Sequence, residues 1–102
     1  MAGSIQNFRD EWLQLFFVYG TSHKCIPANI ETALARKLDI IHAAKSHLDL
    51  RAPPGNRFEM LQPPLQRYAS IRINGQYRLI FQWTDGKAWD LYLDPHRYKH
   101  HR

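Results

Sequence analysis

The sequence has very little cysteine and no long apolar run. The single cysteine, Cys25, excludes a disulfide within the chain and is typical of a protein that stays in a reducing cytosol. It lies in the loop-like segment 21–27 with no base beside it, which favours an inert thiol over a nucleophile. No apolar run approaches the length of a membrane span, and residues 1–6 lack the basic and apolar regions of a signal peptide. We therefore expect a cytoplasmic protein without membrane contact.

Internal repeats and low-complexity segments are also absent, and 102 residues suffice for a single hydrophobic core. We expect one domain over residues 1–102, with a flexible basic tail at 97–102. Acidic residues are scarce in the second half, since residues 62–102 hold seven Lys or Arg against three Asp or Glu. Basic charge among aromatic residues is typical of nucleic-acid binders, although an acidic protein partner fits it as well.

A β-hairpin is predicted over residues 69–83, with its turn at an Asn-Gly pair. A three-residue loop pairs Ile71 with Leu79 and brings the apolar side chains of both strands to one face. Gly75 or Gln76 is expected in the left-handed conformation that ends such a loop. The apolar face consists of Ile71, Ile73, Tyr77, Leu79, Phe81 and Trp83. Such a face must be covered by other elements.

The opposite face of the hairpin carries Arg72 directly across from Arg78. Like charges in this position are destabilising by up to about 1 kcal/mol, and an anion between them relieves the repulsion. Alternatively, both guanidinium groups simply point into water. Alternation in the last strand puts Trp89, Leu91 and Leu93 on the apolar face and Asp90, Tyr92, Asp94 and His96 on the other. We therefore expect arginines, a carboxylate, a histidine and a phenol on one concave, solvated face.

The first half of the chain predicts two helices. The first helix is expected over residues 11–19, which are apolar on almost every side. Apolar residues spaced by three and four positions over 30–48 predict a second, amphipathic helix with Lys37 on its solvated side. Short strands are expected at 5–8 and 58–61. The predicted fold class is α+β, with two N-terminal helices packed on one face of a small antiparallel sheet.

Four stretches resemble the HigB branch of the RelE/ParE toxin superfamily: residues 5–8, 49–61 and 70–81, and the Asp-x-His of Asp94 and His96. The resemblance covers nearly the whole chain. It implies a RelE-like toxin fold and the toxin of a type II toxin–antitoxin module, a ribosome-dependent mRNA endonuclease that acts at the ribosomal A site. It also implies a HigA-like antitoxin with a helix-turn-helix domain, through which alone the chain would contact operator DNA.

The sequence departs from the family pattern at two places. Where the family usually shows Leu-Lys-Gly-Asp, this chain has Leu61-Gln62-Pro63-Pro64, and Pro95 stands where the family usually has tyrosine in Asp-Tyr-His. Both departures remove a proton donor or a charge from the implied site.

The resemblance suggests a site for metal-free cleavage by the RNA 2′-hydroxyl, which needs a base, an acid and positive charge at the phosphorus. On this hypothesis His96 transfers protons, and Asp94 orients the imidazole or joins the transfer. Arg78 stabilises the developing negative charge. The candidates for RNA binding are Arg72, Gln62, Arg67 and Tyr92. Neither a metal nor another cofactor is required.

Other interpretations stay open. Without the resemblance, His96 and Asp94 are simply solvated residues at the end of an edge strand. The chain is alternatively a ParE-like inhibitor of DNA gyrase, although such a protein has no use for the Asp-x-His motif or the basic face. A catalytically weakened toxin that serves as a co-regulator with its antitoxin is the third interpretation, and Gln62 and Pro95 favour it.

Overall fold

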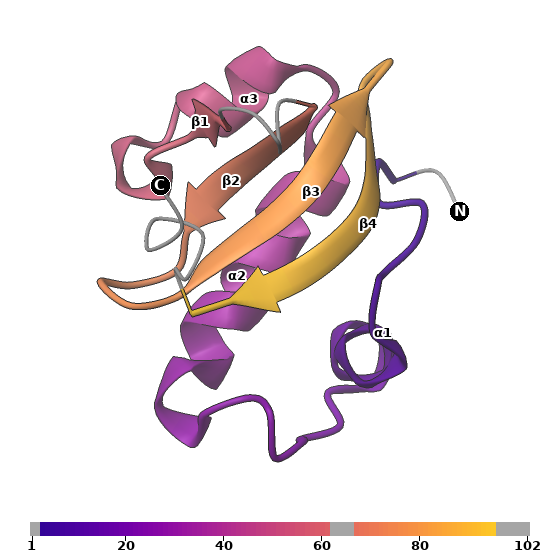
Figure 1. Cartoon of the computed structure of the whole chain (residues 1–102), viewed down its shortest axis with the longest axis vertical. Coiled ribbons are helices and arrows are strands. Elements are labelled where there is room, and N and C mark those ends of the chain that lie inside the picture. Colours follow the sequence, from indigo (N-terminus) through magenta and orange to yellow (C-terminus); the bar gives the residue numbers. More distant parts are fainter. Residues whose placement is uncertain (1–2, 62–66, 96–102) are drawn as a thin grey trace.

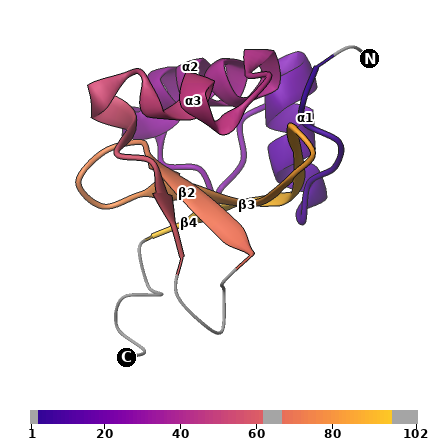
Figure 2. The ribbon, with the colours of Figure 1, turned by 90° about the horizontal axis from the view of Figure 1, so that it is seen from above.

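Within residues 3–61 and 67–95, which the structure describes, four strands form one antiparallel meander and the helices cover one of its faces (Figures 1 and 2). The structure is a computed structural model. The strands, in spatial order, are β1 (Glu59–Met60), β2 (Tyr68–Arg72), β3 (Arg78–Thr84) and β4 (Lys87–Asp94). The helices are α1 (Glu11–Tyr19), α2 (Glu31–Ala43) and α3 (His47–Arg51), with 3-10 turns η1 (Ala28–Ile30) and η2 (Pro54–Asn56). The predicted α+β class is confirmed.

The β2–β3 hairpin has the register that its sequence predicts. In the ladder Ile71 lies opposite Leu79, and Arg72 lies opposite Arg78. Because side chains alternate between the faces of a strand, the two aliphatic side chains point to the helices and the two arginines point away. The sheet therefore has an inner face under the helices and an outer face that carries the arginine pair.

The turn of this hairpin is closed by the side chain of Asn74. Its Oδ1 accepts hydrogen bonds of 2.8 Å from the backbone N–H groups of both Gln76 and Tyr77. Neither Gly75 nor Gln76 has a positive φ, so the expected left-handed residue is wrong. The asparagine supplies the acceptor that closes the loop, as is common for this residue type in turns.

A bulge in β4 changes which of its residues face the helices. Between the pairs Ile80–Tyr92 and Gln82–Trp89, two residues of β4 lie opposite one residue of β3. Asp90 occupies the bulge with a φ of 54°, a left-handed conformation that aspartate adopts more readily than most residues.

The bulge reverses the alternation expected for the start of β4. Ala88 and Leu91 are fully buried, whereas Trp89 is 37% exposed and pairs with Gln82 of the outer face. The predicted place of Trp89 on the apolar face is therefore wrong. Strict alternation assumes one residue for each register position, and the extra residue moves every side chain before it to the other face.

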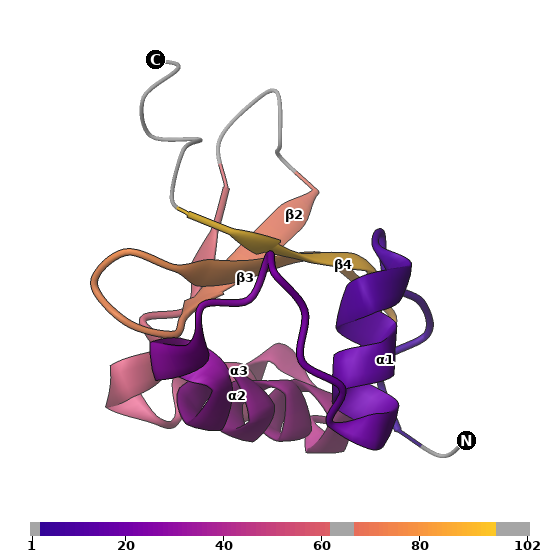
Figure 3. The same ribbon diagram turned by 90° about the horizontal axis from the view of Figure 1, so that it is seen from below.

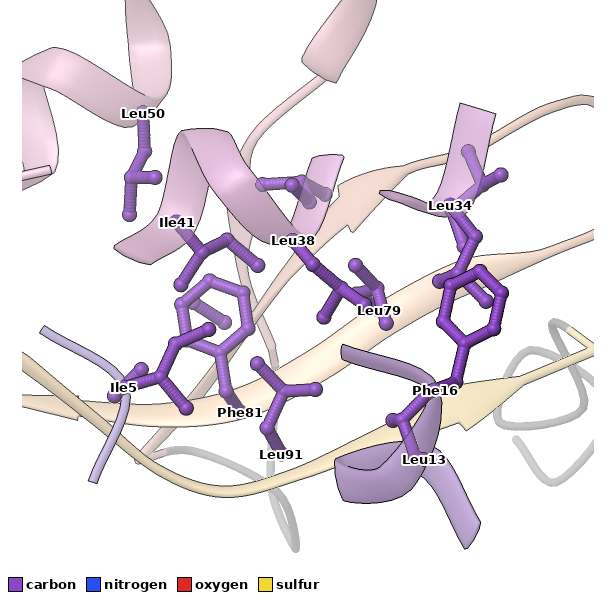
Figure 4. Packing of buried hydrophobic residues seen from close by; sticks show 14 of the residues in the cluster. Ile5, Leu13, Phe16, Leu34, Leu38, Ile41, Leu50, Leu79, Phe81 and Leu91 are labelled. Atoms are coloured by element: carbon purple, nitrogen blue, oxygen red, sulfur yellow. The ribbon is translucent and has the colours of Figure 1, made fainter. Parts of the chain in front are cut away.

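The core lies between α2 and the inner face of the sheet, with α1 at its side (Figures 3 and 4). Large buried side chains from all three helices and from three strands meet here, among them Leu13 and Phe16, Leu34, Leu38 and Ile41, Leu50, and Ile71, Leu79, Phe81 and Leu91. Tyr77 and Trp83 pack against this cluster. The apolar face predicted for the hairpin is thus confirmed.

The amphipathic pattern over 30–48 forms two helices instead of one. Ser46 begins α3, because its Oγ accepts from the Leu48 N–H at 3.2 Å while Asp49 Oδ2 accepts from the Ser46 N–H at 3.3 Å. This reciprocal pair is a capping box, which starts a new helix. Leu48 is consequently 65% exposed, and its expected place on the buried face is wrong.

The segment 5–8 lies along the free side of β4, although it does not form the strand that was expected. It makes isolated parallel bridges to β4 at Ile5 and Phe8. Between these bridges, Asn7 Oδ1 accepts a 2.6 Å hydrogen bond from the backbone N–H of Asp90. The segment therefore supports the bulge and brings the next residues of the chain to the edge of the sheet.

We expect Leu38→Ala to lower the free energy of unfolding by about 2–5 kcal/mol, because truncating a fully buried leucine leaves a cavity. Leu48→Ala should change it by less than about 0.5 kcal/mol, because that side chain is mostly exposed. Urea denaturation followed by circular dichroism measures both values. An equally large loss for the two variants would contradict the separate position of α3.

Candidate functional site

The paired arginines Arg72 and Arg78 have different surroundings on the outer face. Arg78 is only 4% exposed. Its Nε–H donates to Ser70 Oγ at 2.9 Å, and a terminal N–H donates to the carbonyl oxygen of Arg57 at 2.6 Å. Arg72 is half-buried. The register of the predicted pair is confirmed, but the expected solvated position is wrong for Arg78, whose guanidinium is buried and held in place by hydrogen bonds.

A pocket of about 530 Å³ lies beside this pair. Its lining comes from the segment that leads into β1, from the facing ends of β2 and β3, and from the hairpin turn: Arg57, Phe58, Glu59, Arg72, Asn74, Gly75 and Arg78. Three arginines against one glutamate leave an excess of positive charge in the lining. Planar guanidinium groups with several donors are well suited to a phosphate group.

Asp94 completes a row of charged residues across three strands. It lies directly opposite Arg78 in the β3–β4 ladder, while Arg72 lies opposite Arg78 on the other side. Tyr92, one step along β4, lies opposite Ile80. Asp94 and Tyr92 are both half-buried. The structure therefore brings together three of the sequence-predicted site residues in one row, with the tyrosine adjacent.

The outer face is less solvated than the sequence analysis predicted. Ser70 and Ile80 are fully buried, and Leu61 is 6% exposed. Ile80 shares the outer face with Arg78 because the two are separated by one residue along β3. Ile80 was the signal in the sequence for a second buried patch here, because this apolar residue alternates with Arg78 and Gln82 on the outer face.

Several predicted residues lie outside the described part of the chain. These are His96, Gln62, the Pro63-Pro64 pair and the basic tail 97–102. Arg67 is described, and it lies just before β2 with its side chain exposed.

The position of Arg57 depends on a buried polar contact beneath it. Asn56 is fully buried, and its Oδ1 accepts from Lys37 Nζ at 2.5 Å while its Nδ2–H donates to the Leu50 carbonyl oxygen at 3.0 Å. Arg57 follows with a φ of 45°, in the left-handed region. The hydrogen bonds of Asn56 thus tie residues 52–58 between α3 and β1, which we call the crossing segment, to α2 and α3. They also set where Arg57 presents its carbonyl oxygen to Arg78.

Lys37 is only 8% exposed, so its expected solvated position is wrong. Burial, followed by the nearby charge of Arg36, lowers the pKa of this lysine. The signal was present in the sequence, because residue 37 follows Leu34 by three positions and precedes Ile41 by four. That spacing belongs to the apolar stripe of the helix.

A second polar cluster on the outer face joins β2, β4 and the segment before α1. Arg9 Nε and a terminal nitrogen donate to the two carboxylate oxygens of Asp90 at 3.1 and 2.6 Å. Tyr68 donates its hydroxyl to Asp90 Oδ2 at 2.7 Å. The Arg9 guanidinium carbon lies 3.7 Å from the centre of the Tyr92 ring. We call these four residues the Arg9 cluster.

The charges of the Arg9 cluster are stabilised by its own hydrogen bonds. The hydrogen bonds from Arg9 lower the pKa of Asp90, and the hydrogen bond to Asp90 raises the pKa of Tyr68. Burial raises the pKa of Tyr92. At neutral pH the cluster is thus one ion pair with two neutral phenols. Sequence reasoning missed Arg9, because it is 81 residues from Asp90 and no local pattern joins them.

In residues 3–61 and 67–95, no three His, Cys, Asp or Glu side chains lie close enough together to hold a metal ion. The helices of the same two stretches are all too short or too polar to cross a bilayer.

The α+β arrangement is consistent with a RelE-like fold, and comparison with known proteins places the chain in the RelE-like class of type II toxins. A family described as the RelE-like toxin of type II toxin–antitoxin system HigB matches residues 6–96. The chain therefore belongs to the HigB-like toxins, as its sequence motifs predict. Membership in this family implies an antitoxin partner.

The chain is similar to proteins of two bacteria over most of its length. It is 56% identical over 91 residues to Toxin HigB-1 of Vibrio cholerae serotype O1, an alignment that covers 89% of this chain and 96% of that protein. It is 47% identical over 93 residues to an uncharacterised protein of Haemophilus influenzae, with 91% and 92% of the two chains covered.

Lys37 predicts a pH dependence of stability. Because its pKa is lowered in the folded chain, the unfolded chain binds more protons between that lowered value and the ordinary value of 10.5. Stability therefore rises with pH through this interval. We expect the free energy of unfolding of the wild type to increase relative to Lys37→Met as the pH rises toward 10.5. Urea denaturation at several pH values measures the difference, and a difference that is constant or falls with pH would contradict the burial of the charged amine.

Proposed function

We propose that this toxin is a ribosome-dependent mRNA endonuclease that acts in the cytoplasm, at the ribosomal A site. The observation that carries the proposal is the row of Arg72, Arg78 and Asp94 beside a pocket that Arg57 also lines. A cluster of guanidinium groups with one neighbouring carboxylate suits a phosphodiester that must be both bound and attacked. Membership in the HigB-like family supports the same activity.

Arg78 is suited to stabilise charge in a transition state because its position is set before RNA binds. Hydrogen bonds to Ser70 Oγ and to the Arg57 carbonyl oxygen hold the guanidinium, and burial removes competing water. A donor that is already oriented stabilises new negative charge without a reorganisation cost. Arg72, next to it and half-buried, adds positive charge at the edge of the pocket.

In the proposed reaction, a base removes the proton of the 2′-hydroxyl, and O2′ attacks the adjacent phosphorus. The bond from phosphorus to the 5′-oxygen breaks, and an acid protonates that oxygen. The products are a 2′,3′-cyclic phosphate and a 5′-hydroxyl. We assign proton transfer to His96, orientation of its imidazole to Asp94, and charge stabilisation to Arg78 and Arg72. The proposed RNA contacts also include Gln62, Arg67 and Tyr92.

The ribosome dependence follows from what the site lacks. With Gln62 and Pro95 in place of the family's lysine and tyrosine, the chain supplies fewer charged or proton-donating groups. The ribosome would then have to position the message, and free RNA should be cut poorly. The same two departures favour the second candidate function, a weakened toxin that acts as a co-regulator with its antitoxin.

The proposed antitoxin is a HigA-like protein with a helix-turn-helix domain, through which the pair binds operator DNA. We expect co-expression of such a protein, encoded next to this chain, to restore growth and to co-purify with the toxin. Electrophoretic mobility shift should detect operator binding by the complex and by the antitoxin, but not by the toxin by itself. Operator binding by the isolated toxin would contradict this division of roles.

Induced expression of the wild type should arrest growth and produce new mRNA ends within codons, mapped by primer extension. We expect His96→Ala and Arg78→Ala to lower cleavage by about 100-fold, the usual loss when a proton-transfer group or a charge-stabilising donor is removed. Arg72→Ala should lower it less, because that arginine is half-buried at the edge of the pocket.

The matched control is Arg36→Ala, which removes an exposed arginine from α2 and should leave cleavage unchanged. Because Arg78 is buried, circular dichroism must first show that its variant is folded, and Arg72→Ala serves as the second test. Full cleavage by folded His96→Ala and Arg78→Ala variants would refute the assigned site. DNA damage signalling without mRNA breaks would support the gyrase interpretation, and neither effect would support the co-regulator.

A further inference from the structure

We propose that the Arg9 cluster is a stacking site for one base of the RNA whose phosphate lies in the arginine-lined pocket. The inference rests on the proposed function and extends it, because it adds a base-binding position to a site so far defined by phosphate chemistry. The Arg9 cluster lies on the same outer face but outside the pocket lining.

The guanidinium of Arg9 lies over the face of the Tyr92 ring. Its carbon lies 3.7 Å from the centre of the Tyr92 ring, a distance that corresponds to direct contact with the ring face. The Arg9 side chain nevertheless keeps 44% of its surface exposed. A planar group with one side against a ring and much of its surface accessible offers a second planar side to an incoming base.

The orientation of Arg9 is fixed in its own plane. Nε and a terminal nitrogen both donate to the carboxylate of Asp90, and Tyr68 donates to the same carboxylate. Asp90 is in turn held by the bulge, where its backbone N–H donates to Asn7 Oδ1. These contacts use the edge of the guanidinium and leave its flat side for stacking.

The charge of the cluster selects a base over a phosphate. Arg9 is neutralised by its bidentate partner Asp90, so it offers a polarisable flat surface with little net charge. The pocket, by contrast, has three arginines against one glutamate in its lining. Phosphate oxygens should therefore prefer the pocket and a base should prefer the Arg9 cluster. Every base has a flat face, so the site should tolerate all four, with purines favoured by their larger area.

The spacing of the two positions suits a single nucleotide. Tyr92 lies opposite Ile80, and Arg78, which lines the pocket, is two residues from Ile80 along β3. Such diagonal neighbours on one face of an antiparallel pair lie about 7–8 Å apart. This is comparable with the reach from a phosphate to the base of the same nucleotide.

The test compares intact mRNA with mRNA that lacks one base. Purified ribosomes carry a short mRNA, and the rate of cleavage is measured for the intact message and for messages with an abasic nucleotide on either side of the cut. We expect the wild type to cut one abasic message about tenfold more slowly, which corresponds to the loss of one stacked base.

Arg9→Lys keeps the charge but loses the planar group and its bidentate contact. We expect this variant to cut the intact message about tenfold more slowly than the wild type does. On the abasic message that the wild type cuts slowly, the variant and the wild type should have equal rates. Tyr92→Leu should behave in the same way, whereas Tyr92→Phe should keep most of the wild-type rate. Arg72→Ala should slow cleavage of intact and abasic messages by equal factors, because it contributes charge. The matched control is Arg36→Lys on α2.

An equal loss for Arg9→Lys on both messages would show that Arg9 only ties the segment before α1 to β4, and would overturn the inference. An unchanged rate for Arg9→Lys, or a wild-type rate insensitive to abasic sites, would overturn it too. In each of these cases the proposed nuclease activity survives. If the wild type cuts no message on the ribosome, the proposed function fails, and the stacking site fails with it.

Discussion

In the β2–β3 ladder, Leu79 and Phe81 point to α2, while Arg78 and Ile80 point to the other side of the sheet. This alternation is the constraint on which the rest of the molecule depends. A slip of one residue would place the Arg78 guanidinium in the core and expose two large apolar side chains. The burial of the apolar face therefore keeps Arg78 on the outer face, beside the pocket, and no separate interaction is needed to choose that face.

Two buried cationic side chains, Arg78 and Lys37, form hydrogen bonds to residues at or next to the pocket. Arg78 donates to Ser70 and to the Arg57 carbonyl oxygen, and Lys37 donates to Asn56. Burial of a charge is unfavourable unless hydrogen bonds replace the lost water, and both contacts do so at the crossing segment before β1. The segment is thus held by polar contacts that contribute less to stability than an apolar core would, but that fix donors and acceptors around the arginine-lined pocket.

The bulge in β4 gives the outer face its second chemical character. It turns Asp90 toward Arg9 and Tyr68, so that an ion pair with two phenols lies one step along the strand from Asp94. Around the arginine-lined pocket the outer face is rich in positive charge, whereas at the Arg9 cluster it is nearly neutral and aromatic. A nucleotide has the same division between its phosphate and its base.

The sequence by itself determined the α+β class, the hairpin register and the arginine pair, because these follow from alternation and spacing over a few residues. It also placed Asp94 on the face of Arg78, since β4 is regular between Tyr92 and Asp94. Only the tertiary structure decided the burial of Arg78, the outward turn of Trp89 and the partnership of Arg9 with Asp90. These depend on a bulge and on contacts between segments far apart in the chain, and the free energy of such contacts has no signature in any local pattern.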